Sequence, residues 1–177
     1  LCKTKWKNGS NWNMIKILCV GKIKENYLDE LINDYKKRIG KYIKIEIIEL
    51  KDDVNYDKEI SNLIKNIKTS DYNIGLDLKG KMYSSVEFAD KIDKILPQNS
   101  NITFIIGGSL GLNDEARSLC NELISFSQMT FPHGLFRGIL LEQIYRACKI
   151  NNHEMYHKWG CMKVNEIRNM KVALTHA

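Results

Sequence analysis

Short apolar runs rich in β-branched residues alternate along the chain with stretches whose apolar residues recur at helical spacing. The runs predict buried strands at 15–20, 43–50, 72–78, 102–106 and 123–127. The stretches between and after them predict helices at 25–39, 56–68, 85–95, 113–121 and 133–150, with Ser84 or Ser85 and Asn113 as N-caps. Strands that alternate with helices in this way are typical of a parallel sheet with helices on its faces. The pattern predicts an α/β fold, a three-layer sandwich with a mostly parallel sheet.

The helix predicted at 133–150 is apolar around most of its circumference. Its apolar residues include Leu135, Ile139, Leu141, Ile144 and Cys148. A helix that packs on one side of a sheet needs only an apolar stripe. We therefore expect this helix to be covered on two sides, with a symmetry-related copy as one of the covers, and we predict a homodimer.

The composition narrows the class of protein. The 177 residues are 44% hydrophobic and 27% charged, which is typical of a soluble globular protein. No apolar run approaches the ~20 residues that a membrane-spanning helix needs, so no membrane partner is predicted. The five cysteines contain no C-x-x-C pair and are odd in number, which favours a reducing compartment. The predicted location is the cytoplasm.

The two ends of the chain differ from the rest. The net charge is +6, of which residues 1–13 carry +3 and residues 159–177 carry +2, so the span between them carries only +1. All three tryptophans lie in these ends, and Met14 directly precedes the first apolar run. We expect one domain at 14–158, with 1–13 and 159–177 as non-native or unstructured flanks. Any RNA binding by this domain must come from a local patch.

Two loops at predicted strand ends have the composition of a ligand site. Gly107, Gly108 and Gly111 follow the fourth predicted strand, where glycines let the backbone approach a ligand, although a tight turn explains them equally well. The sequence there matches neither a Walker loop nor a dinucleotide fingerprint. The second loop, 126–133, combines apolar side chains with small hydroxyl residues that could enclose a purine. Its alternative interpretation is a helix start with a packed Phe-Pro pair.

One pattern points to different chemistry. His153-Glu154-Met155-Tyr156-His157 fits H-E-x-x-H, in which two histidines one helical turn apart bind zinc and the glutamate acts as a base. That chemistry needs a stable helix and a third ligand, whereas here the pattern follows Asn151-Asn152 at the end of the domain. We interpret it as a chance match and predict no metal. Arg137, Arg146 and Lys149 on the last helix form either a phosphate-binding patch or a solvated face.

Taken together, six segments carry a resemblance to a known family. The chain resembles the bacterial large-subunit rRNA pseudouridine N3-methyltransferases, small members of the SPOUT superfamily. The segments are Met14-Ile15-Lys16-Ile17 with Val20-Gly21-Lys22, Leu76-Asp77 with Gly80-Lys81, Phe104 to Ser109 with Gly111-Leu112, Leu123 to His133, Leu141 to Ala147, and Tyr156-His157-Lys158.

The resemblance implies a fold, a cofactor and partners. It implies a deep trefoil knot at the carboxyl end of the domain, a homodimer, and methylation of N3 of a pseudouridine in the 23S rRNA of assembled ribosomes. It also implies that S-adenosyl-L-methionine binds in the knot, with contacts from Leu76, Gly107, Gly108, Phe126, Ser127, Gln128, Met129, Thr130 and Phe131. A non-catalytic ribosome- or RNA-binding protein with the same knotted fold is the alternative.

The resemblance also suggests which residues face the target uridine. The candidates for catalysis are His133, Arg137, Tyr156 and His157, with the terminal Tyr-His pair reaching across the dimer into the partner's site. The general base among them is left open. Gly134 and Gly138 stand where bulkier residues are expected in the family, so they either weaken the helix by up to ~1 kcal/mol each or permit close helix approach. A residue other than the common proline at 155, and 19 residues beyond Lys158, are further departures.

Overall fold

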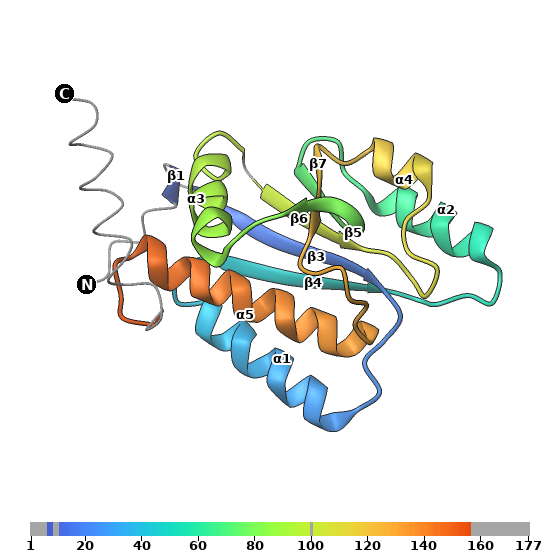
Figure 1. Cartoon of the computed structure of the whole chain (residues 1–177), viewed down its shortest axis with the longest axis horizontal. Helices are drawn as coiled ribbons and strands as arrows, with labels where there is room; N and C mark the ends of the chain where they lie inside the picture. Colours follow the sequence, from blue (N-terminus) through green and yellow to red (C-terminus); the bar gives the residue numbers. More distant parts are fainter. Residues whose placement is uncertain (1–6, 9–10, 100, 157–177) are drawn as a thin grey trace.

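A five-stranded sheet in which every pairing is parallel forms the centre of the molecule (Figure 1). The computed structural model describes residues 7–8, 11–99 and 101–156. The strand order is β4-β3-β6-β5-β7. The strands are β3 (Met14–Val20), β4 (Lys44–Leu50), β5 (Tyr72–Met82), β6 (Asn101–Ile106) and β7 (Glu122–Ser125), preceded by a short antiparallel pair, β1 (Lys7–Asn8) and β2 (Asn11–Trp12).

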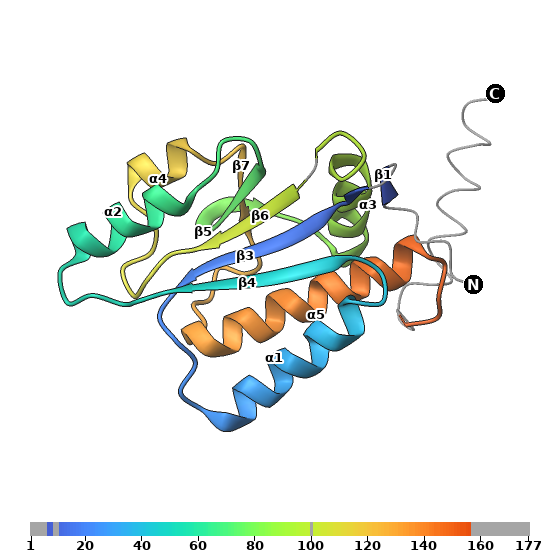
Figure 2. The same cartoon turned by 180° about the vertical axis from the view of Figure 1, so that it is seen from behind.

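Helices cover both faces of the sheet, which confirms the predicted α/β class (Figures 1 and 2). One face packs against α1 (Asn26–Ile39), α3 (Ser85–Ile95) and α5 (His133–Asn151), and the other against α2 (Tyr56–Asn66) and α4 (Asp114–Ser118). Each predicted strand and helix is present. The main differences are that β5 extends to Met82, whereas β7 and α4 are shorter than expected.

The alternation of side chains along each strand divides the core between the two faces. Ile15, Ile17 and Cys19 of β3 pack toward α1, α3 and α5, whereas Leu18 and Val20 pack toward α2 and α4. Since both faces are covered, a central strand needs apolar residues at nearly every position. This requirement explains the continuous apolar runs in the sequence.

Side-chain caps fix the start of two helices. The Ser84 Oγ accepts a hydrogen bond from the Glu87 backbone N–H at 3.2 Å, and the Glu87 carboxylate accepts one from the Ser84 N–H at 2.8 Å. This reciprocal capping box decides between the two serines predicted for the position. Asn113 caps α4, as predicted, by accepting a hydrogen bond from the Ala116 N–H at 2.8 Å.

Helix α5 lies between α1 and α3, so both helices supply part of the cover that its apolar surface requires. A methyl group on Gly134 would lie 2.7 Å from Leu28 Cδ1 of α1, and one on Gly138 would lie 2.9 Å from Leu31 Cδ2. The two glycines therefore permit close approach of α1 and α5. No helix in the described ranges is both long and apolar enough to cross a membrane.

A buried ion pair lies near the amino ends of the central strands. Lys16 Nζ of β3 donates to Asp71 Oδ2 at 2.7 Å, and Thr103 and Asn101 of β6 each donate to the same carboxylate at 2.9 Å. Burial alone would raise the pKa of Asp71, but the three hydrogen bonds outweigh burial and hold the pKa below its usual value. The charge is therefore fully partnered where it is buried.

Candidate functional site: a cleft at the carboxyl ends of the strands

A cleft of about 560 Å³ opens where β6 and β7 end, beside the irregular middle of β5. Parallel α/β sheets bind ligands at this edge, because the loops that leave neighbouring strands diverge there. The cleft is lined by Leu76, by the glycine loop (residues 107–111) and by most of the aromatic loop (residues 125–131). Of the nine residues that the resemblance implies for cofactor binding, all but Gln128 line it: Leu76, Gly107, Gly108, Phe126, Ser127, Met129, Thr130 and Phe131.

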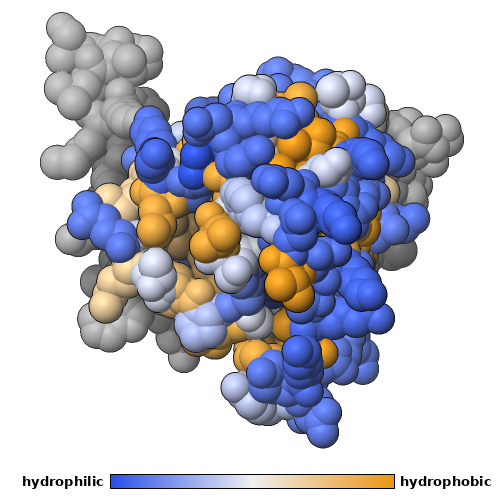
Figure 3. Space-filling view, turned by 90° about the vertical axis from the view of Figure 1, so that its right-hand side faces the viewer, coloured by the Kyte–Doolittle hydropathy of each residue, from blue (hydrophilic) through white to orange (hydrophobic). Residues whose placement is uncertain are grey.

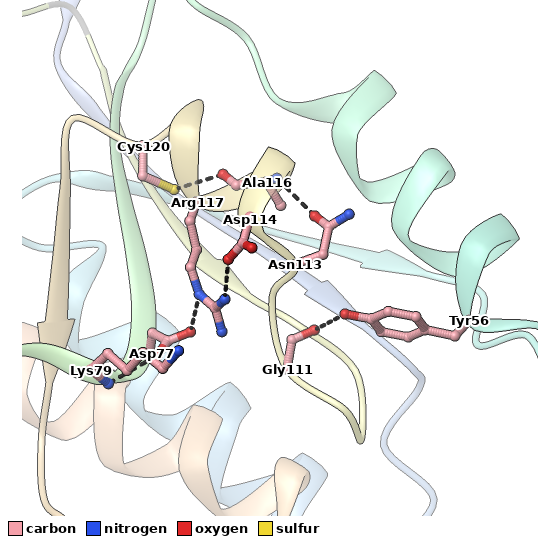
Figure 4. Close-up of polar contacts among 9 residues, drawn as sticks. All are labelled: Tyr56, Asp77, Lys79, Gly111, Asn113, Asp114, Ala116, Arg117 and Cys120. Atoms are coloured by element: carbon pink, nitrogen blue, oxygen red, sulfur yellow. Dashed lines mark hydrogen bonds and ion pairs between the residues drawn. The ribbon is translucent and has the colours of Figure 1, made fainter.

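Two residues of the glycine loop, Gly107 and Gly108, have no room for a side chain. A methyl group on Gly107 would lie 2.5 Å from the carbonyl carbon of Gly111, and one on Gly108 would lie 1.8 Å from Glu59 Oε1. The Tyr56 hydroxyl of α2 donates to the Gly111 carbonyl at 3.5 Å (Figure 4). Helix α2 therefore packs against the back of the loop, and the front presents bare backbone to the cleft.

The aromatic loop forms the apolar wall of the cleft. The rings of Phe126 and Phe136 meet edge to face at 5.5 Å, and Phe131 stacks on Phe136 at 5.8 Å. The hydroxyl groups of the loop fix its backbone, because Ser125 Oγ donates to the Ser127 carbonyl at 2.9 Å and Ser127 Oγ accepts from the Met129 N–H at 3.0 Å. The predicted combination of apolar and hydroxyl side chains is thus a structured loop rather than only a helix start.

Three charged residues also line the cleft: Asp77 and Lys79 of β5 and Arg117 of α4, together called the charged wall. Arg117 Nε donates to Asp77 Oδ2 at 2.8 Å, and Nη1 donates to Asp114 Oδ1 at 2.8 Å (Figure 4). The hydrogen bond that Arg117 donates to the Asp77 carboxylate raises the pKa of Arg117 above its usual value. Asp77 and Arg117 are not among the site residues predicted from the sequence, although the position of Asp77 directly after an apolar strand run could have indicated a site role.

His133 also lines the cleft, as the first residue of α5. Its Nδ1 is buried and has no hydrogen-bond partner among the described residues. Buried polar atoms are rarely left without a partner, and such atoms concentrate where a ligand or water completes the site. The cleft therefore combines bare backbone, an apolar wall, three charges and an imidazole.

Comparison with known proteins identifies the family that uses this arrangement. A family model described as "Predicted SPOUT methyltransferase" matches residues 14–157. The chain belongs to the SPOUT methyltransferase family. It is 46% identical to a protein of Clostridium acetobutylicum and 49% identical to one of Clostridium novyi, both named ribosomal RNA large subunit methyltransferase H, and each match covers 81% of this chain and 99% of the relative.

The fold of this SPOUT methyltransferase is also found among solved structures. A probable methylase family protein from Haemophilus influenzae Rd KW20 superimposes with a TM-score of 0.51 at 12% sequence identity, covering 78% of this chain and 66% of that chain. The likeness concerns the fold alone, because the two sequences have diverged widely.

Arg137 of the SPOUT chain is buried and donates its hydrogen bonds to groups of the same chain. The residue is 2% exposed, and its Nη1 donates to Glu49 Oε1 at 2.7 Å. Nη2 donates to the Val20 and Gly21 carbonyls, both at 2.7 Å. These contacts join the first turns of α5 to the carboxyl ends of β3 and β4. Arg137 does not line the cleft, so within this chain its position is that of a structural support for the helix that carries His133.

Tyr156 follows α5 and packs back on the helix as far as Glu142, which lies roughly 13 Å of helix from His133. Its ring packs edge to face on Tyr145 at 5.0 Å and under the Arg146 guanidinium at 4.9 Å, and its hydroxyl donates to Glu142 Oε1 at 3.4 Å. A single chain therefore does not bring Tyr156 to His133. His157, the fourth residue predicted for catalysis, lies outside the described residues.

The H-E-x-x-H pattern of the SPOUT chain is not helical. Helix α5 ends at Asn151, and His153 has a positive φ of 56°. Glu154 pairs with Lys149 and accepts a hydrogen bond from the Tyr42 hydroxyl at 3.0 Å. Within the described ranges, no three histidine, cysteine or acidic side chains gather in a way that could hold a metal ion.

Proposed function

We propose that this SPOUT methyltransferase transfers a methyl group from S-adenosyl-L-methionine to N3 of a pseudouridine in 23S rRNA. The observation that carries the proposal is the cleft itself, in which the glycine loop and the aromatic loop meet at the ends of neighbouring strands. The names of the Clostridium relatives support the substrate, since both are called large-subunit rRNA methyltransferases. The implied partner is the ribosome, and the implied location is the cytoplasm.

The cleft fits the proposed cofactor. Gly107 and Gly108 both line the cleft and carry no side chains, so their backbone groups can contact an adenosine edge. Phe126, Met129 and Phe131 offer an apolar surface for its ring, and Leu76 lines the cleft as well. S-adenosylmethionine would supply a methyl group bound to a positively charged sulfur. A deprotonated ring nitrogen would attack the methyl carbon from the side opposite the sulfur. The protein must align the two reactants and exclude water.

His133 is the described residue best placed to handle the proton. The target N3–H must lose its proton as the new nitrogen–carbon bond forms and the carbon–sulfur bond breaks. His133 lies in the cleft, and its unpartnered Nδ1 leaves the imidazole free to exchange hydrogen bonds. We assign it to holding or relaying that proton.

A trefoil knot is part of the proposal. Ile124 of β7 is in register with β5 twice, at Leu76 and at Lys81, and the residues between these two bulge out of the ladder. A methyl group on Gly80 would lie 2.4 Å from the Ile124 carbonyl carbon, so the bulge crosses directly over the β7 backbone. Such a close crossing supports a threaded chain, which is rare in proteins. The crossing lies beside the cleft, because Leu76 and Ile124 both line it.

We also propose that the active form is a homodimer. Leu135 on the outer side of α5 is 40% exposed, and Phe131 and Met129 beside it are 37% and 74% exposed. Figure 3 shows apolar side chains among hydrophilic ones on the side toward which the strand ends point. A second copy packed on α5 would cover this surface. It would also let Tyr156 act in the cleft of the partner, because within one chain Tyr156 packs on α5 and does not line the cleft.

Methyl transfer to ribosomes tests the proposal. The full chain should transfer label from S-adenosylmethionine to large-subunit RNA of ribosomes that lack the modification, and nucleoside mass spectrometry should find N3-methylpseudouridine. His133→Ala should reduce the rate by about 100-fold while cofactor binding stays within about twofold. Arg38→Gln, on the exposed side of α1, serves as the control. Ribosome binding without methyl transfer by the wild type would favour the non-catalytic RNA-binding alternative.

A further inference from the structure

The two sides of the cleft differ in charge. All three of the fully charged side chains that line it within the described ranges belong to the charged wall: Asp77, Lys79 and Arg117. The aromatic loop contributes only apolar and hydroxyl-bearing side chains to the cleft. A ligand that matched both sides would carry an apolar ring at one end and charges of both signs at the other.

The Asp77–Arg117 pair retains bonding capacity for such a ligand. Among the described residues, Asp77 and Asp114 accept hydrogen bonds from two of the five N–H donors of Arg117. The Asp77 carboxylate accepts from Arg117 and from the Lys79 backbone N–H at 2.9 Å, which leaves further lone pairs. The side chains are 7% exposed for Asp77 and 24% exposed for Arg117. The pair is thus shielded from bulk water and still open to the cleft (Figure 4).

We propose that Arg117 and Asp77 bind the amino-acid end of S-adenosylmethionine, with the guanidinium on the carboxylate and the Asp77 carboxylate on the ammonium group. The inference rests on the proposed function, since it assumes that adenosine lies against the aromatic loop. Only a ligand with both charges uses both members of the pair, because a lone anion would meet Asp77 and a lone cation would meet Arg117. A pair that only braced α4 against β5 would be indifferent to the ligand.

Two ligands that share adenosine and a thioether sulfur separate these possibilities. S-adenosylhomocysteine has the amino-acid end, and 5′-methylthioadenosine lacks it. Calorimetry on the full chain should show that Arg117→Gln and Asp77→Asn each weaken S-adenosylhomocysteine binding by about tenfold or more, the size expected for a charge-assisted hydrogen bond. Binding of 5′-methylthioadenosine should stay within about twofold, and Arg117→Lys should recover part of the loss, because it keeps the charge.

Arg38→Gln is the matched control, because it removes an arginine from the exposed Arg38–Asp34 pair of α1, away from the cleft. It should leave both affinities unchanged. Equal losses for both ligands in the Arg117 and Asp77 variants would overturn the inference in favour of a bracing role, and unchanged affinities for both would overturn it as well. If the wild type bound neither ligand, the proposed cofactor itself would be wrong, and the inference would fall with it.

Discussion

Two aspartates, one just before strand β5 and one in its middle, form ion pairs of opposite character. Asp71, just before the strand, is 3% exposed with Lys16 at 9%, and its carboxylate also accepts from Thr103 and Asn101. Asp77, in the middle of the strand, is 7% exposed with Arg117 at 24%, and this pair lines a cleft. At the amino end of the sheet the Asp71 carboxylate is therefore buried and hydrogen-bonded to three side chains. At the carboxyl end the Asp77–Arg117 pair still has donors and lone pairs that a ligand could use.

The difference shows how one sheet separates stability from function. Removing one member of a buried ion pair leaves the other charge without compensation, so the amino-end pair should matter chiefly to folding. The carboxyl end holds bare glycine backbone and an unpartnered imidazole nitrogen, features that contribute little to folding. Substitutions at the amino end should accordingly change the free energy of unfolding, and substitutions at the carboxyl end should change the affinity for the cofactor.

Asp71→Ala should produce the largest loss of stability. The variant leaves the Lys16 ammonium buried and unpaired, and we expect the free energy of unfolding to fall by roughly 3 kcal/mol or more. Urea denaturation at pH 7 measures the loss, and S-adenosylhomocysteine affinity should change by less than about twofold. Asp34→Ala, in the exposed pair with Arg38, should cost at most about 1 kcal/mol. Equal losses in the two variants would contradict the structural role given to the amino-end pair.

Gly107→Arg should have the converse effect. Since even a methyl group at this position would lie 2.5 Å from the Gly111 carbonyl carbon, an arginine must displace the glycine loop or enter the cleft. We expect S-adenosylhomocysteine affinity to fall by about 100-fold or more, with a loss of stability below that of Asp71→Ala. Val54→Arg, at a fully exposed position, controls for the added charge. Unchanged affinity in Gly107→Arg would place the cofactor elsewhere.

The sequence predicts most of the fold because the elements are marked locally. The apolar runs give the strands, and Ser84 and Asn113 mark helix starts through hydrogen bonds to backbone only a few residues away. The end of β5 is missed because Lys79 and Lys81 are typical of a solvated loop. These residues are in strand conformation because the chain returns to pair with β7, a contact between segments about 40 residues apart that leaves no local pattern.

The same limit applies to the site. The glycine and aromatic loops are recognisable as runs of neighbouring residues, and the structure brings them to one cleft. Arg117 reaches Asp77 across 40 residues, and Arg137 reaches Glu49 across 88, so neither partnership is visible in the sequence. An arginine on a predicted helix face indicates a charge but does not tell whether a carboxylate or a pair of strand-end carbonyls already holds it.

Protonation of Asp71 at low pH tests the same amino-end pair, with a smaller expected loss of stability than the Asp71→Ala substitution. Because the pKa of Asp71 is lower in the folded state than in the unfolded chain, its contribution is fully present above the unfolded value of about 4. The contribution is lost as the pH falls through the folded pKa. The loss should be smaller than in Asp71→Ala, because a protonated carboxyl still accepts hydrogen bonds. Urea denaturation between pH 6 and pH 3, roughly the range in which carboxyls titrate, should show a shallower decline for Asp71→Asn than for the wild type. Parallel declines in the two proteins would mean that the pKa of Asp71 is the same in the folded and unfolded states, so that its ionisation does not stabilise the fold.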